Sequence, residues 1–161
     1  RSAAHRHPPH GRGTVGMVQV FPNSRNVIPG RVKFSIDLRN STDALVDAMA
    51  AEVKAFADQV AKEHGVQVHI EMVSSYPAQL FQPECVEAVG RAAAKLGYSH
   101  MPAVSGAGHD AVYMAKLAPS GMIFIPCKDG ISHNEIEDAK PEHIEAGCNV
   151  LLHAMLERAG T

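Results

Sequence analysis

The sequence lacks most of the features that assign a small protein to a class at once. Its three cysteines, Cys85, Cys127 and Cys148, are an odd number at wide spacings that fits neither a disulfide framework nor a CxxC metal site. No apolar run approaches the roughly 20 residues that cross a bilayer, and no charged-then-apolar secretion signal opens the chain. The formal net charge of −2 gives no general attraction to nucleic acid or anionic membrane. We therefore expect a cytoplasmic protein without nucleic-acid or membrane partners.

Short metal-binding motifs are also missing. Residues 14–161 contain no HExxH, no HxH and no Cys/His cluster, although the ten histidines of the chain are more than usual and hint at chemistry. Three of these histidines lie in residues 1–13, which have almost no apolar content and no period. We interpret this stretch as disordered or foreign to the fold.

The first half of the chain carries strand and helix patterns. Residues 14–22 and 31–39 alternate and predict two strands, the second with one apolar and one polar face. Residues 41–65 predict a helix, with capping residues at its start, an apolar stripe at helical spacing and Gly65 as a stop. Residues 66–73 alternate again. The order strand, strand, helix, strand predicts most of a ββαβ layer.

The second half of the chain predicts an α/β layer. A proline-bearing passage at residues 74–83 marks the boundary between two units. Helices are expected after Pro83, over residues 108–117 and from Pro141 onward. Between the last two, residues 120–126 form a short continuous apolar run that is typical of a strand buried on both faces.

Two histidines follow patterns that favour chemistry. His109 comes after Gly106 and Gly108 at an expected helix start, where a histidine can donate to a polarised carbonyl. An ordinary glycine-rich turn with a capping residue explains the same pattern equally well. His133 follows the apolar run, and strand ends are where α/β proteins build their sites. Imidazole is a common zinc ligand, but a lone loop histidine is the commoner case.

Arg39 is a candidate for binding an acidic group. Arg39 ends the polar face of a strand, and its guanidinium suits a carboxylate. A surface salt bridge with Asp37 or Asp43 is the simpler explanation for this arginine. Asn26 lies in the connection before the strand.

Three stretches together resemble one family. These are "GTVGMVQVFPNSRNVIPGRVKFSIDLR", "SGAGHDA" and "IPCKDGISHNEIE". They closely resemble the C-terminal part of the metal-dependent N-carbamoyl-L-amino-acid hydrolases, β-ureidopropionases and allantoate amidohydrolases, in the aminoacylase/carboxypeptidase-type clan of di-metal hydrolases. The likeness covers roughly residues 11–159, with the motifs in the family's order and spacing.

The resemblance implies a fold and a set of roles. Residues 14–76 would be a partial α+β lid domain, ββαβ and ferredoxin-like, that carries the contact of a homodimer. Residues 77–161 would be the C-terminal part of a zinc-hydrolase-type α/β catalytic domain. The family holds two divalent metal ions, zinc or manganese, which activate a water molecule. The resemblance makes His133 a metal ligand and His109 a catalytic residue at the scissile group, and it makes Asn26 and Arg39 ligands of the substrate carboxylate.

The family's other metal ligands and its general base have no counterpart in this sequence. We therefore expect a fragment of an amidohydrolase that is inactive alone, because one imidazole binds a divalent metal poorly. An alternative from another class is a non-catalytic module that self-associates through the exposed edge of the lid sheet. A ferredoxin-like small-molecule sensor explains the ββαβ layer but not the sequence around His133.

Overall fold

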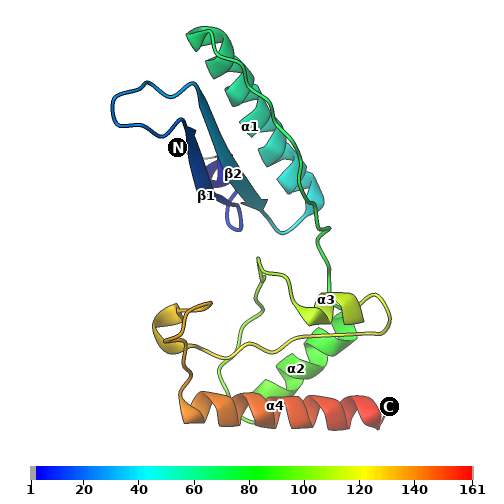
Figure 1. The fold of residues 1–161 in the computed structure, drawn as a ribbon. Helices are drawn as coiled ribbons and strands as arrows, with labels where there is room; N and C mark the ends of the chain where they lie inside the picture. Colours follow the sequence, from blue (N-terminus) through cyan, green and yellow to red (C-terminus); the bar gives the residue numbers. More distant parts are fainter. Residues whose placement is uncertain (1–2, 161) are drawn as a thin grey trace. The chain divides into compact units, whose positions relative to one another are not determined.

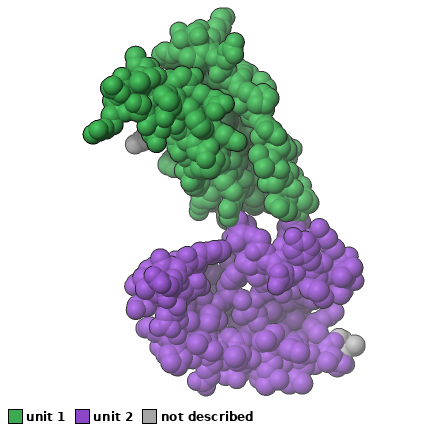
Figure 2. Space-filling view, in the orientation of Figure 1, with its two compact units in different colours: residues 1–78 green, residues 79–161 purple. Residues whose placement is uncertain are grey.

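A computed structural model describes residues 3–160 of the protein. It comprises two compact units, residues 1–78 and residues 79–161 (Figures 1 and 2). Each unit has its own secondary structure and its own buried cluster. No helix among residues 3–160 is both long and apolar enough to span a membrane.

Unit 1 is built on an antiparallel hairpin of β1 (Arg12–Phe21) and β2 (Arg31–Arg39). Val15 pairs with Ile36 and Val18 pairs with Phe34. Val15 and Val18 are three residues apart, so a regular strand would point them to opposite faces. A register shift at Gly16 inserts one extra residue, a β-bulge, and brings both valines to the face of Ile36 and Phe34. The simple alternation expected for the first strand is therefore wrong at this point.

Helix α1 (Asp43–His64) begins and ends at the residues that the sequence predicts. The Thr42 hydroxyl accepts the backbone N–H of Leu45 at 3.4 Å, so it caps one of the unpaired donors of the first turn. Gly65 ends the helix in the left-handed conformation, at φ 64°, and donates its N–H to the carbonyl of Ala61. A residue with a β-carbon is strained at this φ, which explains the glycine.

The N-terminal segment belongs to the fold, contrary to the expectation of a disordered or foreign tail. The short helix η1 (Ala3–Arg6) buries its two alanines against Met49 of α1, which is itself fully buried. Its arginine pairs with Glu52, and His7 Nε2 lies 2.8 Å from the other oxygen of the same carboxylate. These contacts, His7 first, lower the pKa of Glu52. The alternating apolar pattern starts only at β1, so the sequence of the N-terminal segment contains no periodic pattern that predicts its packing. Residues 1 and 2 of the expected tail lie outside the described part.

The two further strands expected from the sequence are absent. Residues 66–82 and 119–127 have no regular secondary structure. A strand is defined by hydrogen bonds to a neighbouring strand, and within residues 3–160 only β1 and β2 pair with each other. The α/β class holds for the chain, but the ββαβ, ferredoxin-like detail of the lid is not confirmed.

Unit 2 is organised by the packing of α2 (Pro83–Lys95) on α4 (Pro141–Ala159) (Figure 1). The contact is made by small apolar side chains that allow a close approach, namely Ala88, Ala92, Ala93, Val150 and Ala154. At its margin Arg91 Nη2 lies 2.6 Å from the Glu157 carboxylate, which lowers the pKa of Glu157. Both helices carry proline in the first turn, as expected. The short α3 (Asp110–Met114) and η2 (Lys128–Gly130) lie in the segment between them.

The packed N-terminal segment predicts an effect of Gly11→Ala. A β-carbon at residue 11 would lie 2.5 Å from the carbonyl oxygen of Ala4 and 2.6 Å from that of His7. Because both obstacles are backbone atoms, we expect the variant to lose about 1–3 kcal/mol of unfolding free energy, measured by urea denaturation. Gly30→Ala is the matched control, since nothing lies within 4 Å of its β-carbon. Equal stability of the two variants would show that residues 3–11 do not pack as described.

Candidate functional site

The four residues singled out from the sequence lie in different units. Asn26 and Arg39 belong to unit 1, and His109 and His133 belong to unit 2. Each pair is therefore described in its own surroundings.

Arg39 is the last residue of β2 and is already engaged with a carboxylate. Its Nε donates to Asp37 Oδ1 at 2.6 Å, and its Nη2 donates to Asp37 Oδ2 at 3.2 Å. This two-point contact raises the pKa of Arg39, chiefly through the hydrogen bond and then through the charge of Asp37. The partner is thus one of the two aspartates expected from the sequence. An acidic ligand of Arg39 would have to share the guanidinium with Asp37.

Asn26 lies in the connection between β1 and β2. The Ser24 hydroxyl donates to Asn26 Oδ1 at 2.8 Å, which orients the amide. With Oδ1 accepting, the amide nitrogen is the donor that this side chain can present to a ligand. Such a donor suits the carboxylate oxygen that the family resemblance implies as its ligand.

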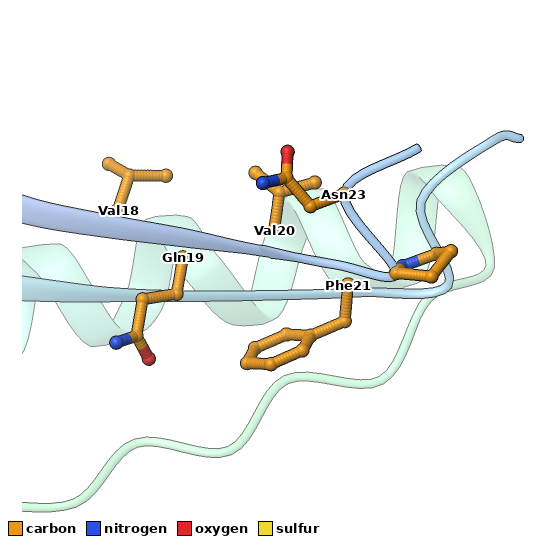
Figure 3. Close-up of a pocket in the computed structure, with 6 residues that line it drawn as sticks. Val18, Gln19, Val20, Phe21 and Asn23 are labelled. Atoms are coloured by element: carbon orange, nitrogen blue, oxygen red, sulfur yellow. The ribbon is translucent and has the colours of Figure 1, made fainter. Parts of the chain in front are cut away.

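A hollow of about 460 Å³ lies at the end of β1 but contains none of the four candidates (Figure 3). It is lined by six consecutive residues from Val18 to Asn23. Figure 3 shows Val18 and Val20 on one side of the strand and Gln19 and Phe21 on the other. Side chains that alternate between two faces do not converge on one ligand. Arg31 covers the ring of Phe21, with its Cζ atom 4.2 Å from the ring centroid. We assign no site to this hollow.

His109 is held by contacts from two directions. Its Nε2 lies 2.6 Å from the hydroxyl oxygen of Ser105. Its ring meets the ring of Phe124 edge to face, with centroids 5.5 Å apart. His109 is also the residue before α3, as the glycine-rich motif predicted, but that helix has only five residues. Ser105 and Phe124 were not singled out from the sequence, since nothing in the sequence tells which neighbours a loop histidine will contact.

His133 lies in a loop closed by backbone hydrogen bonding. Lys128 donates its N–H to the carbonyl of Asp138 at 2.7 Å and so joins the two ends of the loop. His133 has φ 56°, a conformation uncommon for residues other than glycine. Its N–H donates to Glu137 Oε2 at 3.0 Å, and Asn134 Oδ1 accepts the N–H of Ile136 at 3.1 Å. The side chains of Glu137 and Asn134 therefore bind backbone N–H groups of the loop.

The described residues do not form a metal site by themselves. Among residues 3–160, no three His, Cys, Asp or Glu side chains gather where they could hold a metal ion. His133 alone supplies one imidazole, whereas a catalytic zinc takes three protein ligands. A di-metal centre therefore does not fit the described residues on their own.

An apolar groove of about 710 Å³ also lies in unit 2, between α2, α4 and the run that includes Ile123 and Ile125. Its lining is mostly aliphatic, with Arg158 at its border, and includes neither His109 nor His133. The groove carries no cluster of polar groups for chemistry. It marks a surface that the unit leaves uncovered.

The comparisons with known proteins all point to the same family. The model described as peptidase family M20/M25/M40 matches residues 6–157. The chain is 47% identical to an N-carbamoyl-L-amino-acid amidohydrolase of Rhizobium meliloti, over 99% of this chain and 38% of the relative. It is 34% identical to a ureidoglycolate hydrolase of Arabidopsis thaliana, over 86% of this chain and 29% of the relative.

Solved structures that resemble this chain point to the same family as the sequence comparisons. A hydantoinase/carbamoylase family amidase from Burkholderia multivorans superposes with a TM-score of 0.93 at 54% identity, over 98% of this chain and 38% of the other. The chain thus spans less than two fifths of the length of the proteins that it matches.

The loop geometry predicts an effect of Glu137 on His133. Glu137→Ala removes the acceptor of the His133 N–H, so we expect hydrogen exchange at that amide to become about 2- to 10-fold faster, as loss of a hydrogen bond worth about 0.5–1.5 kcal/mol implies. Glu137→Gln keeps a carbonyl oxygen and should restore part of the protection. Glu135→Ala, in the same loop, is the control. Exchange at His133 that is unchanged in Glu137→Ala would contradict this role.

Proposed function

The chain belongs to peptidase family M20/M25/M40, and from that premise we propose that it is part of a metal-dependent amidohydrolase that cleaves linear amide or carbamoyl C–N bonds. The observation that carries this proposal is the 47% identity, over 99% of the chain, to an N-carbamoyl-L-amino-acid amidohydrolase. The proposed substrates are N-carbamoyl amino acids or related ureido acids, such as ureidopropionate or allantoate. Each of these substrates carries a carbonyl flanked by nitrogen and, elsewhere in the molecule, a carboxylate.

In this proposal the four candidate residues divide two tasks. Asn26 and Arg39 hold the substrate carboxylate, the arginine through the fork that now engages Asp37. His109 donates a hydrogen bond to the oxygen of the scissile carbamoyl or amide group and stabilises the charge that develops there. His133 binds one of two divalent metal ions, zinc or manganese. When bound, such ions lower the pKa of a water molecule and supply the nucleophile.

The chain needs ligands from outside the described residues for this chemistry. Residues 3–160 hold no cluster of three metal-binding side chains, and one imidazole binds a divalent ion weakly. We therefore propose that the isolated chain does not turn over substrate. This follows from the ligand count and does not depend on which carbamoyl or ureido acid the site accepts.

A chimera tests the proposal directly. In the R. meliloti relative, the segment that matches this chain is replaced by the chain itself. We expect the chimera to hydrolyse N-carbamoyl amino acids in the presence of zinc or manganese, and the isolated chain under the same conditions to be inactive. His133→Ala in the chimera should lower both the bound metal, measured by elemental analysis, and the rate.

The control for this experiment is His69→Ala, an exposed histidine in the segment that follows α1. It should leave metal content and rate unchanged. A chimera that folds but binds metal equally well with and without His133 would refute the metal role. Robust turnover by the isolated chain would refute its dependence on further ligands.

We also propose that unit 1 supports self-association, as a homodimer through the lid. The supporting observation is the apolar face of the β1–β2 hairpin, where Val18, Val32, Phe34 and Ile36 remain 43–58% exposed. A two-stranded hairpin also has outer backbone edges that can pair with another strand. This surface serves equally the alternative of a non-catalytic association module.

Sedimentation velocity over a range of concentrations tests self-association. We expect the sedimentation coefficient to rise with concentration, and Phe34→Lys to abolish the rise because it places a charge in the centre of the apolar face. Phe56→Lys, on the exposed part of α1, is the control. A monomer at every concentration would contradict the proposal.

A further inference from the structure

Ser105 and His109 form a contact that the proposed function does not by itself require. The Ser105 hydroxyl oxygen lies 2.6 Å from Nε2 of His109. We propose that Ser105 is a positioning residue that donates its hydroxyl proton to Nε2 and so fixes His109 as the neutral tautomer with its proton on Nδ1. The catalytic meaning of this inference rests on the proposed function, but the tautomer itself does not.

The surroundings of the hydroxyl favour it as the donor. At 2.6 Å the hydroxyl oxygen and Nε2 are within hydrogen-bond distance, so one of the two groups donates to the other. A neutral imidazole has one donor nitrogen and one acceptor nitrogen. With Nε2 as the acceptor, the ring proton is on Nδ1.

The hydroxyl is itself held in place by the backbone. The N–H of Ala107 donates to Ser105 Oγ at 3.2 Å, which occupies one of the two lone pairs of the oxygen. This bond closes a tight turn across Gly106, so the serine side chain is tied to the loop that leads to His109. Because the oxygen already accepts this backbone N–H, the proton of the hydroxyl is the group that we assign to Nε2, which accepts it.

Phe124 sets the plane of the imidazole. Its ring meets that of His109 at an interplanar angle of 64°, an edge-to-face arrangement that aromatic rings prefer. Phe124 belongs to the apolar run at residues 120–126, so it comes from a different part of unit 2 than Ser105. One contact therefore fixes the plane of the ring and the other fixes which nitrogen carries the proton.

The fixed tautomer has a consequence for the reaction. A carbonyl oxygen needs a hydrogen-bond donor, and a donor held ready before the reaction stabilises developing charge without reorganisation. Nδ1–H would be that donor in every molecule, whereas an imidazole without a partner exchanges between its two tautomers. Ser105 thus acts on the substrate only through His109.

Nitrogen-15 NMR of the chain tests the tautomer without metal or substrate. At alkaline pH, where imidazole is neutral, we expect His109 of the wild-type chain to show Nε2 at the position of an unprotonated nitrogen and Nδ1 at that of an N–H. Ser105→Ala should move the two resonances toward each other as the tautomers mix, and Ser105→Thr should restore them. Ser120→Ala is the control, because its hydroxyl donates to the Ala118 carbonyl.

Two results would overturn the inference. One is a protonated Nε2 in the wild-type chain, and the other is a His109 signal in Ser105→Ala that equals the wild type. The amide spectrum of α2 and α4 verifies in each variant that unit 2 is folded. In the chimera, we expect Ser105→Ala to lower kcat and leave KM unchanged. A tautomer that shifts without any change in kcat would refute the role of His109 in the reaction and leave the tautomer assignment intact.

Discussion

The need of backbone N–H and C=O groups for partners is the constraint on which this structure depends. In unit 1 the ladder between β1 and β2 meets it, with a bulge at Gly16 that keeps the apolar side chains on one face. In unit 2 the helices meet it internally, and α2 and α4 bury small side chains against each other. Where no neighbouring strand is present, as in residues 66–82 and 119–127, regular structure does not form. The need for backbone hydrogen-bond partners thus explains both why β1 and β2 form a sheet and why residues 66–82 and 119–127 do not.

The loops that carry His109 and His133 also provide partners for their backbone N–H groups, but these partners are side chains. Side chains take the place of backbone partners: Glu137 accepts the N–H of His133, and Ser105 accepts the N–H of Ala107. In each case the polar group that tightens the loop lies within four residues of the histidine. Such local bonds hold a side chain in position without the burial that a core would provide. This suits the ligand-binding roles proposed for the two histidines.

Local chemistry made several elements predictable from the sequence. Thr42 and Gly65 bound the long helix because a hydroxyl cap and a left-handed glycine are determined by neighbours a few residues away. Pro83 and Pro141 mark helix starts for the same reason. The expectation for the N-terminal segment was wrong because its first residues, Ala3 to His7, are held by Met49 and Glu52, which are more than forty residues distant. The bulge at Gly16 was missed because a register is a property of two strands together.

In the candidate site, too, some features depend on residues that are neighbours along the chain and others on contacts formed only in the folded protein. The sequence by itself determined the patterns of the two units, because these depend on residue types and their spacing, and its resemblance to a known family pointed to that family and to the four residues proposed for the site. Only the tertiary structure decided that Asp37 engages Arg39 at two points, that Ser105 and Phe124 contact His109, and that His133 adopts a positive φ. The physical reason is that hydrogen bonds and ring contacts depend on distances and directions in space. A linear pattern lists the groups that can form them but does not select the partners.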